Sequence, residues 1–455
     1  MSYVKTSVGY RRRSKRSRVR KRRVFAFALI VTLATLAAWL WNDGRGGVIG
    51  HGVSARALTR KAPLSTQAPH WTNAQRLGLT AALRGAFAPA LDGAGSWSLA
   101  VLAPDGRTIY DDRSDTAVAP ASVQKLIVAA SALDALGPSY RYHTIFAARD
   151  PAGDGVLDGN LWLVGSGDPS LQSSDVRNGI AVLSRSGLRR IDGSVVIDAT
   201  AMNGRAYNSH WDAEDDGQDY AAPTSAISLD GDTVESSDDG GQPVWTPMQD
   251  VERYVAGQTQ TMLRARGILV STSPNLGAAP LGTVVLWDHK SAPLSELEAH
   301  MLFLSDNHYA EQLLRTVGAA ATGASSDDGG VDAERHFLTR LGVPSPGLRL
   351  LDGSGLSRNN RVAAITIARL LAAEEPSLYR LLPRGGREGT LADYDFTTAL
   401  GRVRAKSGHL SNVASLAGYA ATMHHGRVAF AFLIDGSPAD PDAAIVRAVD
   451  RLVEY

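Results

Sequence analysis

The 455-residue sequence contains no cysteine. This absence excludes disulfide bonds, a thiol nucleophile and a zinc site with cysteine ligands. Lysine is scarce as well, because arginine supplies most of the basic residues. After residue 41 the lysines are Lys61, Lys125, Lys290 and Lys406. Arginine does not lose its proton in proteins, so a lysine in such an arginine-rich sequence is a candidate for acid–base chemistry.

Basic charge is concentrated at the N-terminus. Residues 1–23 contain 11 Lys and Arg residues and no acidic residue. The rest of the chain has 36 basic and 46 acidic residues, so its net charge is about −10. We expect this body to repel nucleic acid, and we expect the basic tail to favour anionic lipid on the cytoplasmic side of a membrane.

An apolar run of 18 residues without a charged side chain follows the tail at residues 24–41. As a helix it is just long enough to cross the hydrocarbon core, and the basic residues before it predict an extracytoplasmic body. A cleaved signal peptide is the alternative. No Ala-x-Ala-type cleavage motif directly follows the run, and Trp39 and Trp41 lie where an interfacial aromatic belt would. We therefore favour a retained single-pass anchor in the cytoplasmic membrane.

The rest of the sequence predicts a linker and an α+β body. Residues 42–73 contain Gly, Ala, Ser and Pro without a clear period, and are expected to be an extracytoplasmic linker. Residues 74–139 predict two helices and two strands, whereas residues 140–285 alternate short β-like stretches with Gly and Asp turns. Residues 286–455 return to helical periodicity before the last strands. This order predicts a host domain interrupted by a smaller inserted α/β domain. The acidic stretch at residues 212–219 is expected to be a solvated loop.

A serine and a lysine are three residues apart at the start of a predicted helix. Ser122 and Lys125 would share one helical face. Burial favours loss of a lysine proton, so Lys125 could be the base that makes Ser122 a nucleophile. An isolated Ser-x-x-Lys pattern is more often ordinary helix surface, and the same pattern at residues 2–5 has no expected role.

A Ser-Asp-Asn tripeptide follows a helix-like stretch much later in the chain. Ser305 could relay a proton, and Asn307 could orient both the lysine and a substrate amide. A helix cap is the alternative interpretation, because Ser, Asp and Asn all favour that position.

A Lys-Ser-Gly tripeptide precedes a predicted strand near the C-terminus. Gly408 would let a substrate backbone approach closely, while Lys406 and Ser407 could bind a carboxylate. The alternative interpretation is a β-turn on the surface.

The three motifs in this order are far more specific than any one of them, and they are the set of the penicillin-binding proteins and serine β-lactamases. The sequence resembles the D-Ala-D-Ala carboxypeptidase/endopeptidase family related to penicillin-binding protein 4. The resemblance covers roughly residues 74–455. Four further segments resemble that family: GSGDPSL at 165–171, YAAP at 220–223, DGSGLSR at 352–358 and GTL at 389–391.

The resemblance implies a penicillin-binding, β-lactamase-like transpeptidase domain made of an antiparallel sheet and a helical region. Ser122 and Ser305 are 183 positions apart, and the chain between them would hold the inserted domain. The implied activity is that of a serine-type D-Ala-D-Ala carboxypeptidase or DD-endopeptidase that acts on peptidoglycan stem peptides and is acylated by β-lactams. The implied roles are catalytic for Ser122, Lys125 and Ser305, and substrate-binding for Asn307, Lys406, Ser407, Gly408 and His409.

The sequence departs from the family pattern in two places. The insertion lacks room for a further small β domain that family members often carry. His409 stands where the family usually has Thr or Ser, a hydroxyl that helps to bind the substrate carboxylate. Its backbone N–H, with that of Ser122, would still form an oxyanion hole. We predict retained acylation and an altered substrate preference.

Two other functions stay open at this point. One is a β-lactamase, and the other is a catalytically silent peptidoglycan-binding protein of the same fold. The histidines form no HExxH motif and no Walker-type loop occurs, so we expect neither a metal site nor a nucleotide cofactor. The sequence does not separate carboxypeptidase from endopeptidase, and it leaves the oligomeric state open.

Overall fold

The computed structural model describes residues 71–150, 154–238, 241–436 and 440–455. The described residues all belong to one compact unit. The predicted cytoplasmic tail at residues 1–23, the predicted membrane anchor at residues 24–41 and nearly all of the predicted linker lie outside the described residues. No helix within the described ranges is both long enough and apolar enough to span a bilayer.

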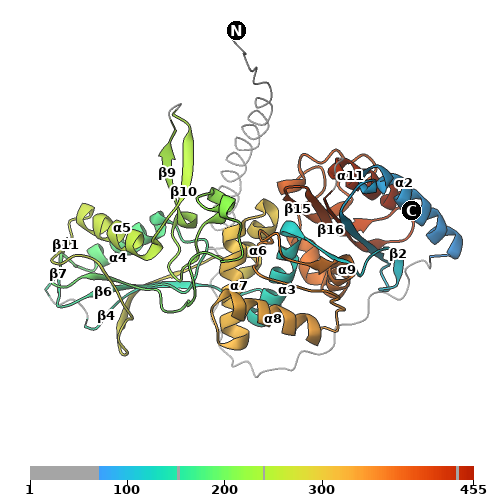
Figure 1. Cartoon of the computed structure of the whole chain (residues 1–455). Coiled ribbons are helices and arrows are strands. Elements are labelled where there is room, and N and C mark those ends of the chain that lie inside the picture. The colour runs from blue at the N-terminus through green and yellow to red at the C-terminus, as the bar shows by residue number, and fades with distance from the viewer. Residues whose placement is uncertain (1–70, 151–153, 239–240, 437–439) are drawn as a thin grey trace, which may run out of the picture. The chain divides into compact units, whose positions relative to one another are not determined.

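The first and last strands of the described chain form one antiparallel sheet (Figure 1). Its strand order is β15-β16-β17-β1-β2, and each neighbouring pair is antiparallel. The strands are β1 (Ser96–Leu102), β2 (Thr108–Asp112), β15 (Val403–Leu410), β16 (Val413–Ala421) and β17 (Arg427–Asp435). Since β17 pairs with β1 along its length, the two ends of the described chain complete the same domain.

Helices cover both faces of this sheet. Successive residues of a strand point to opposite faces, so neighbouring residues of β1 belong to different apolar clusters. Leu99 and Val101 belong to one apolar cluster with helices α2 and α11, whereas Ala100 belongs to a second cluster with α3 and α9. The helices are α2 (Asn73–Leu91), α3 (Lys125–Leu136), α6 (Leu294–Leu304), α7 (Asn307–Thr322), α8 (Asp327–Arg340), α9 (Ala364–Ala373), α10 (Glu375–Leu378) and α11 (Pro441–Val453).

Helix α3 lies at the centre of the helical region and contacts α6, α7, α8, α9 and α10. The apolar run at residues 126–130 is buried on every side as a result. A helix that is apolar all round is stable only in such a surrounded position. The short pair β3 (Ala117–Val118) and β14 (Val362–Ala363) joins the segment before α3 to the segment before α9.

The chain between α3 and α6 builds a second core around two short sheets and two helices. The sheet orders are β12-β8-β6-β4-β13 and β11-β7-β5, and a hairpin of β9 and β10 projects beside them (Figure 1). The elements are β4 (His143–Ala148), β5 (Val156–Leu157), β6 (Leu161–Val164), α4 (Ser173–Arg185), β7 (Arg190–Ile191), β8 (Val195–Asp198), β9 (Thr233–Ser237), β10 (Pro243–Pro247), α5 (Val251–Ala265), β11 (Leu269–Val270), β12 (Asn275–Leu276) and β13 (Val284–Lys290).

The pairing in this intervening segment is mixed. Strands β6, β8 and β12 are parallel, whereas β4 is antiparallel to both β6 and β13. β13 crosses the boundary that we predict at residue 285 and pairs with β4 as far as Lys290. The predicted domain boundaries otherwise stay predictions.

Candidate active site

Ser122 lies in a short 3₁₀ turn, Ala121–Gln124, that leads directly into α3. The sequence predicts this serine at the start of the helix itself, whereas α3 begins only at Lys125. Ala121 has a φ of 47°, in the left-handed region that residues with a side chain rarely adopt. Such conformations occur where the surrounding structure fixes them, and they are common at functional sites.

The ammonium group of Lys125 is completely buried behind this turn. Its Nζ donates to the Ser122 Oγ at 2.9 Å, to the Asn307 Oδ1 at 2.7 Å and to the Ser354 carbonyl oxygen at 2.7 Å. Burial lowers the pKa of Lys125 from 10.5 to about 8, although nearby carboxyl groups, with Glu311 first among them, oppose the shift. A neutral amine can donate two hydrogen bonds and accept a third, so Lys125 can take the hydroxyl proton of Ser122 without losing its other partners.

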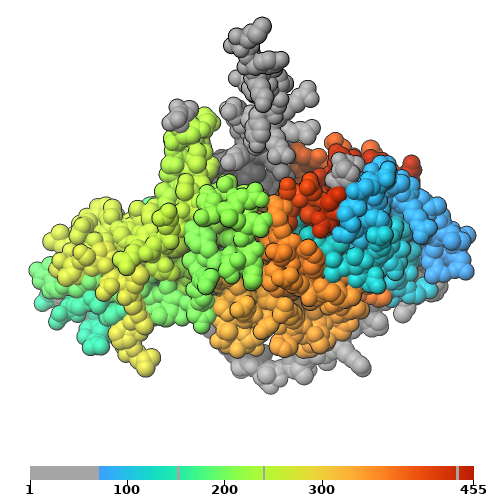
Figure 2. All heavy atoms as spheres, in the orientation of Figure 1, coloured from blue at the N-terminus to red at the C-terminus, as the bar shows by residue number. Residues whose placement is uncertain are grey.

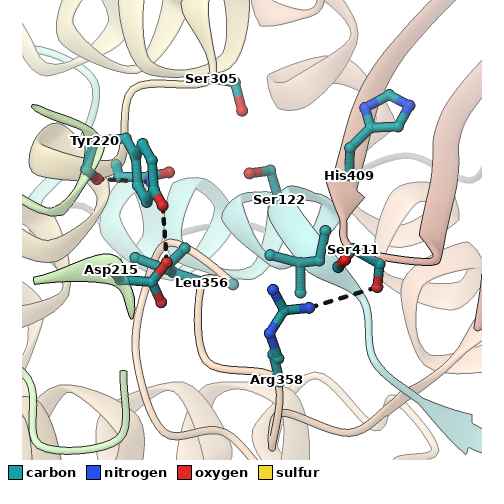
Figure 3. Close-up of a pocket in the computed structure, with 11 residues that line it drawn as sticks. Ser122, Asp215, Tyr220, Ser305, Leu356, Arg358, His409 and Ser411 are labelled. Atoms are coloured by element: carbon teal, nitrogen blue, oxygen red, sulfur yellow. Dashed lines mark hydrogen bonds between the residues drawn. The ribbon is translucent and has the colours of Figure 1, made fainter. Parts of the chain in front are cut away.

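The Ser-Asp-Asn tripeptide joins α6 to α7. Ser305 ends α6 in the left-handed conformation, with a φ of 60°. The Asp306 side chain caps α7 by accepting a hydrogen bond from the backbone N–H of Tyr309 at 3.1 Å. The helix-cap interpretation and the site interpretation therefore both apply. The caps fix the backbone, and the side chains of Ser305 and Asn307 border the pocket beside Ser122 (Figure 3).

Lys406 and Ser407 lie inside strand β15, neither ahead of a strand nor in a surface turn. Lys406 is completely buried, and its Nζ donates to the Ser305 Oγ at 2.8 Å and to the Ser407 carbonyl oxygen at 2.6 Å. The Ser407 hydroxyl donates to the Thr390 Oγ1 at 2.8 Å. Two lysines thus reach two different serines of the same site.

Gly408 is where β15 passes closest to the nucleophile turn. A Cβ atom added to Gly408 would lie 2.8 Å from the Ser122 backbone nitrogen and 3.0 Å from that of Val123. Real Cβ contacts are not that short, so only glycine fits unless the strand moves. This close approach brings the backbone of residue 409 towards the backbone of Ser122. The backbone N–H groups of these two residues form the predicted oxyanion hole.

His409 is held at the edge of the pocket by a carboxylate. Its Nε2 lies 2.8 Å from the Oδ1 of Asp442, in the first turn of α11, and 3.4 Å from the hydroxyl of Tyr394. In Figure 3 the imidazole points away from Ser122. The side chain that replaces the usual hydroxyl is therefore engaged elsewhere.

The predicted residues surround a pocket of about 330 Å³ (Figure 3). Ser122, Ser305, Asn307 and His409 line it directly. Lys125, Lys406, Ser407 and Gly408 lie in or behind its walls, joined to the lining residues by the contacts above. The structure thus brings all eight predicted site residues together. No group of three or more His, Asp or Glu residues in the described part of the chain is arranged to hold a metal ion.

The pocket also contains residues of the intervening segment that we do not predict. The Asn307 Nδ2 donates to the carbonyl oxygen of Tyr220 at 2.9 Å, and the Tyr220 hydroxyl donates to the Asp215 Oδ1 at 2.9 Å. Burial and the hydrogen bond to Asp215 raise the pKa of Tyr220 to about 12. Asp215 is only 6% exposed, so the expectation of a solvated loop is wrong at this residue. In Figure 2 the green residues around position 220 lie directly beside the orange helical region.

Arg358 brings positive charge to the same pocket. Its Nε lies 2.7 Å from the Oδ2 of Asp212, and its Nη1 donates to the carbonyl oxygen of Ser411 at 3.4 Å. The YAAP and DGSGLSR segments are recognisable in the sequence, but nothing in their local pattern places Tyr220 and Arg358 in one pocket with Ser122.

The model of the D-Ala-D-Ala carboxypeptidase 3 (S13) family matches residues 84–242 and 237–454. The chain belongs to this family. The D-alanyl-D-alanine carboxypeptidase of Actinomadura sp. (strain R39) is 30% identical over 447 residues, covering 81% of this chain and 82% of that protein. A carboxypeptidase of Mycobacterium tuberculosis is 31% identical over 353 residues, covering 72% of this chain and 73% of that protein. These relatives confirm the predicted family and the predicted enzyme class, a serine-type D-Ala-D-Ala carboxypeptidase.

Solved structures confirm the predicted fold class. Penicillin binding protein 4 of Haemophilus influenzae superposes with a TM-score of 0.74 at 23% identity, covering 82% of this chain and 99% of that one. At this identity the likeness establishes the fold alone, which is the α+β fold of the penicillin-binding proteins. The same H. influenzae protein has been solved in complex with a β-lactam.

We predict that the rate at which a β-lactam acylates this S13 enzyme rises as the pH increases through about 8, because Lys125 accepts a proton only after losing its own. Lys125→Arg should lower the rate by about 100- to 10,000-fold, since arginine stays charged. Quenched-flow mass spectrometry from pH 6 to 10 measures both effects. Equal rates and equal pH profiles for the two proteins would contradict the assignment of Lys125 as the base.

Proposed function

We propose that this chain hydrolyses peptidoglycan stem peptides through an acyl-enzyme on Ser122. One observation carries the proposal: the buried Lys125 Nζ lies 2.9 Å from the Ser122 Oγ. At this distance an amine can take the hydroxyl proton directly, which is the requirement for a serine nucleophile. Lys125 is hydrogen-bonded to Ser122 and to two further partners that hold it in place, and this arrangement argues against a catalytically silent protein.

In the proposed acylation step, Lys125 accepts the proton of Ser122 as the Ser122 Oγ bonds to the carbonyl carbon of the penultimate D-alanine. The peptide C–N bond breaks as Ser305 gives its hydroxyl proton to the leaving amine and takes up the proton that Lys125 removed from Ser122, so Ser305 and Lys125 return to their starting forms. The 2.8 Å hydrogen bond from Lys406 to Ser305 supports this relay, because a cation beside the hydroxyl favours release of its proton. The backbone N–H groups of Ser122 and His409 stabilise the oxyanion. Water then hydrolyses the ester and restores Ser122.

The proposed substrate contacts come from the two walls of the pocket. Asn307 lies between Lys125 and the carbonyl group of Tyr220, where it can orient the substrate amide. Lys406 and Ser407 supply a cation and a hydroxyl from β15 for the substrate carboxylate.

We also propose the membrane topology and the inserted domain. The 11 basic residues of the tail and the apolar run at residues 24–41 support a single-pass anchor with the catalytic body outside the cytoplasm. The separate apolar core between α3 and α6 supports an inserted α/β domain. In this arrangement the enzyme works next to the membrane on peptidoglycan.

We predict that a protein of residues 63–455 gains the mass of one penicilloyl group when it is mixed with benzylpenicillin. Ser122→Ala should abolish this gain in mass. The complex of the H. influenzae relative with a β-lactam supports the choice of probe. Intact-mass spectrometry measures the adduct over time, and circular dichroism confirms that the variant is folded. Rapid loss of the adduct with turnover of the drug would indicate a β-lactamase. A folded protein that forms no adduct and turns over no drug would favour a silent binder.

We predict that His409→Thr raises kcat/KM for a peptide ending in D-Ala-D-Ala by about 5- to 10-fold, the value of one ordinary hydrogen bond. The new hydroxyl would bind the terminal carboxylate, whereas His409 is held by Asp442. The same peptide with a C-terminal amide is the control, and its kcat/KM should stay unchanged. Equal changes for both peptides, or a loss with the free carboxylate, would contradict a role of residue 409 in carboxylate binding.

A further inference from the structure

The loop at residues 352–358 contacts both the nucleophile turn and the base. The carbonyl oxygen of Ser354 accepts a hydrogen bond from the Lys125 Nζ at 2.7 Å. A Cβ atom at Gly355 would lie 2.0 Å from the carbonyl oxygen of Ala121, so this part of the loop is pressed against the turn. The side chain of Gln124 also donates to the backbone carbonyl of Asp352. The position of this loop therefore sets the relative position of nucleophile and base.

A carboxylate on α7 holds the loop from outside. Glu311 is 2% exposed. Its Oε1 accepts the backbone N–H of Ser354 at 2.7 Å and that of Gly353 at 3.1 Å, and its Oε2 accepts the Gly353 N–H at 3.1 Å. Each of these contacts brings a donor to the carboxyl group, an arrangement that suits the ionised form.

A second carboxylate, that of Asp352, belongs to the loop itself and accepts hydrogen bonds from other loop residues. Asp352 accepts the N–H of Gly355 at 2.9 Å and the N–H of Ser357 at 2.6 Å, together with side-chain donors from Asn360 at 2.8 Å and Trp211 at 3.1 Å. Because Asp352 belongs to the loop, it fixes the shape of the loop. Glu311 belongs to α7 and fixes the place of the loop relative to the rest of the site.

We propose that Glu311 is a positioning residue for acylation: its carboxyl group clamps the amides of Gly353 and Ser354, and thereby fixes the Ser354 carbonyl against Lys125. This inference rests on the proposed role of Lys125 as the base. The clamp acts in two ways. It fixes the direction in which the amine faces Ser122, and its negative charge sets how readily the amine loses a proton.

The effect of Glu311 on the pKa of Lys125 can be measured, because other charged groups surround both side chains. Glu311 makes the largest contribution that raises the pKa of Lys125 against the effect of burial. Burial and the neighbouring carboxyl groups of Asp352 and Asp327 raise the pKa of Glu311 itself to about 8, whereas its loop N–H donors lower it. Glu334, on α8, also faces this group. Glu311 and Lys125 thus titrate in the same pH range, and removing the negative charge that Glu311 carries there should lower the pKa of Lys125 further.

Glu334 is the matched control. It is completely buried, and neither of its carboxyl oxygens has a hydrogen-bond partner in the described structure. Burial raises the pKa of Glu334 well above its ordinary range. Glu334→Gln thus removes a buried carboxyl group of the same region that holds no loop amide, and replaces it by a side chain of the same size.

The experiment measures benzylpenicillin acylation from pH 6 to 10 in residues 63–455, for wild type, Glu311→Gln, Glu311→Asp and Glu334→Gln. Glu311→Gln should slow acylation by about 10- to 100-fold and move the acid limb of its pH profile to lower pH. Glu311→Asp keeps the charge on a shorter side chain, so it should slow acylation without moving the limb. Glu334→Gln should change neither.

A Glu311→Gln profile with the wild-type acid limb would overturn the inference, and so would an equal effect of Glu334→Gln. Should Glu311→Gln fail to fold, Glu311→Asp decides the positional part: wild-type rates in that variant would refute the clamp. No acylation of the wild type at any pH would instead refute the proposed function, so the two failures are distinct.

Discussion

The burial of one ammonium group beside a serine hydroxyl is the constraint on which the rest of the site depends. Taking a lysine out of water is costly unless hydrogen-bond partners replace the water. Lys125 receives its three partners from three separate segments, namely its own 3₁₀ turn, the start of α7 and the loop at residues 352–358. The same burial moves its pKa towards the range in which a base can work.

The architecture follows from this requirement. α3 has to be surrounded by helices, and its N-terminal turn has to meet both α7 and β15. The sheet contributes the second lysine, because β15 carries Lys406 to the hydroxyl of Ser305. The intervening segment closes another wall through Tyr220, whose carbonyl oxygen accepts a hydrogen bond from Asn307. Segments that are far apart in sequence thus share one buried polar network, and such networks hold the site in one arrangement only when nearly every member is satisfied.

Local sequence predicts the chemistry better than the geometry. The spacing of Ser122 and Lys125 and the scarcity of lysine are visible in the chain itself, and the order of the three motifs identifies the family. The secondary structure is less predictable. Ser122 is in a 3₁₀ turn, and Lys406 is inside a strand, because tertiary contacts override local preference at both places.

Long-range partners could not be predicted from the sequence. Asp215 lies in an acidic stretch that is typical of solvent-exposed loops, yet it is buried against the pocket. Asp442 belongs to the last helix and lies 33 positions after His409, the residue that it holds. Glu311 is one of many acidic residues on predicted helices, and only the folded chain places it under the amides of residues 353 and 354. Each of these contacts depends on how the sheet and the helices pack.

The titration of Lys125 tests the central claim most directly. Residues 63–455 contain only three lysines, Lys125, Lys290 and Lys406, so side-chain ¹³C labelling of lysine yields few NMR signals. We predict that the signal lost in Lys125→Arg titrates with a midpoint near pH 8. A midpoint for that signal near the ordinary lysine value of about 10.4 would show that the amine is not poised to act as a base, and would contradict the mechanism.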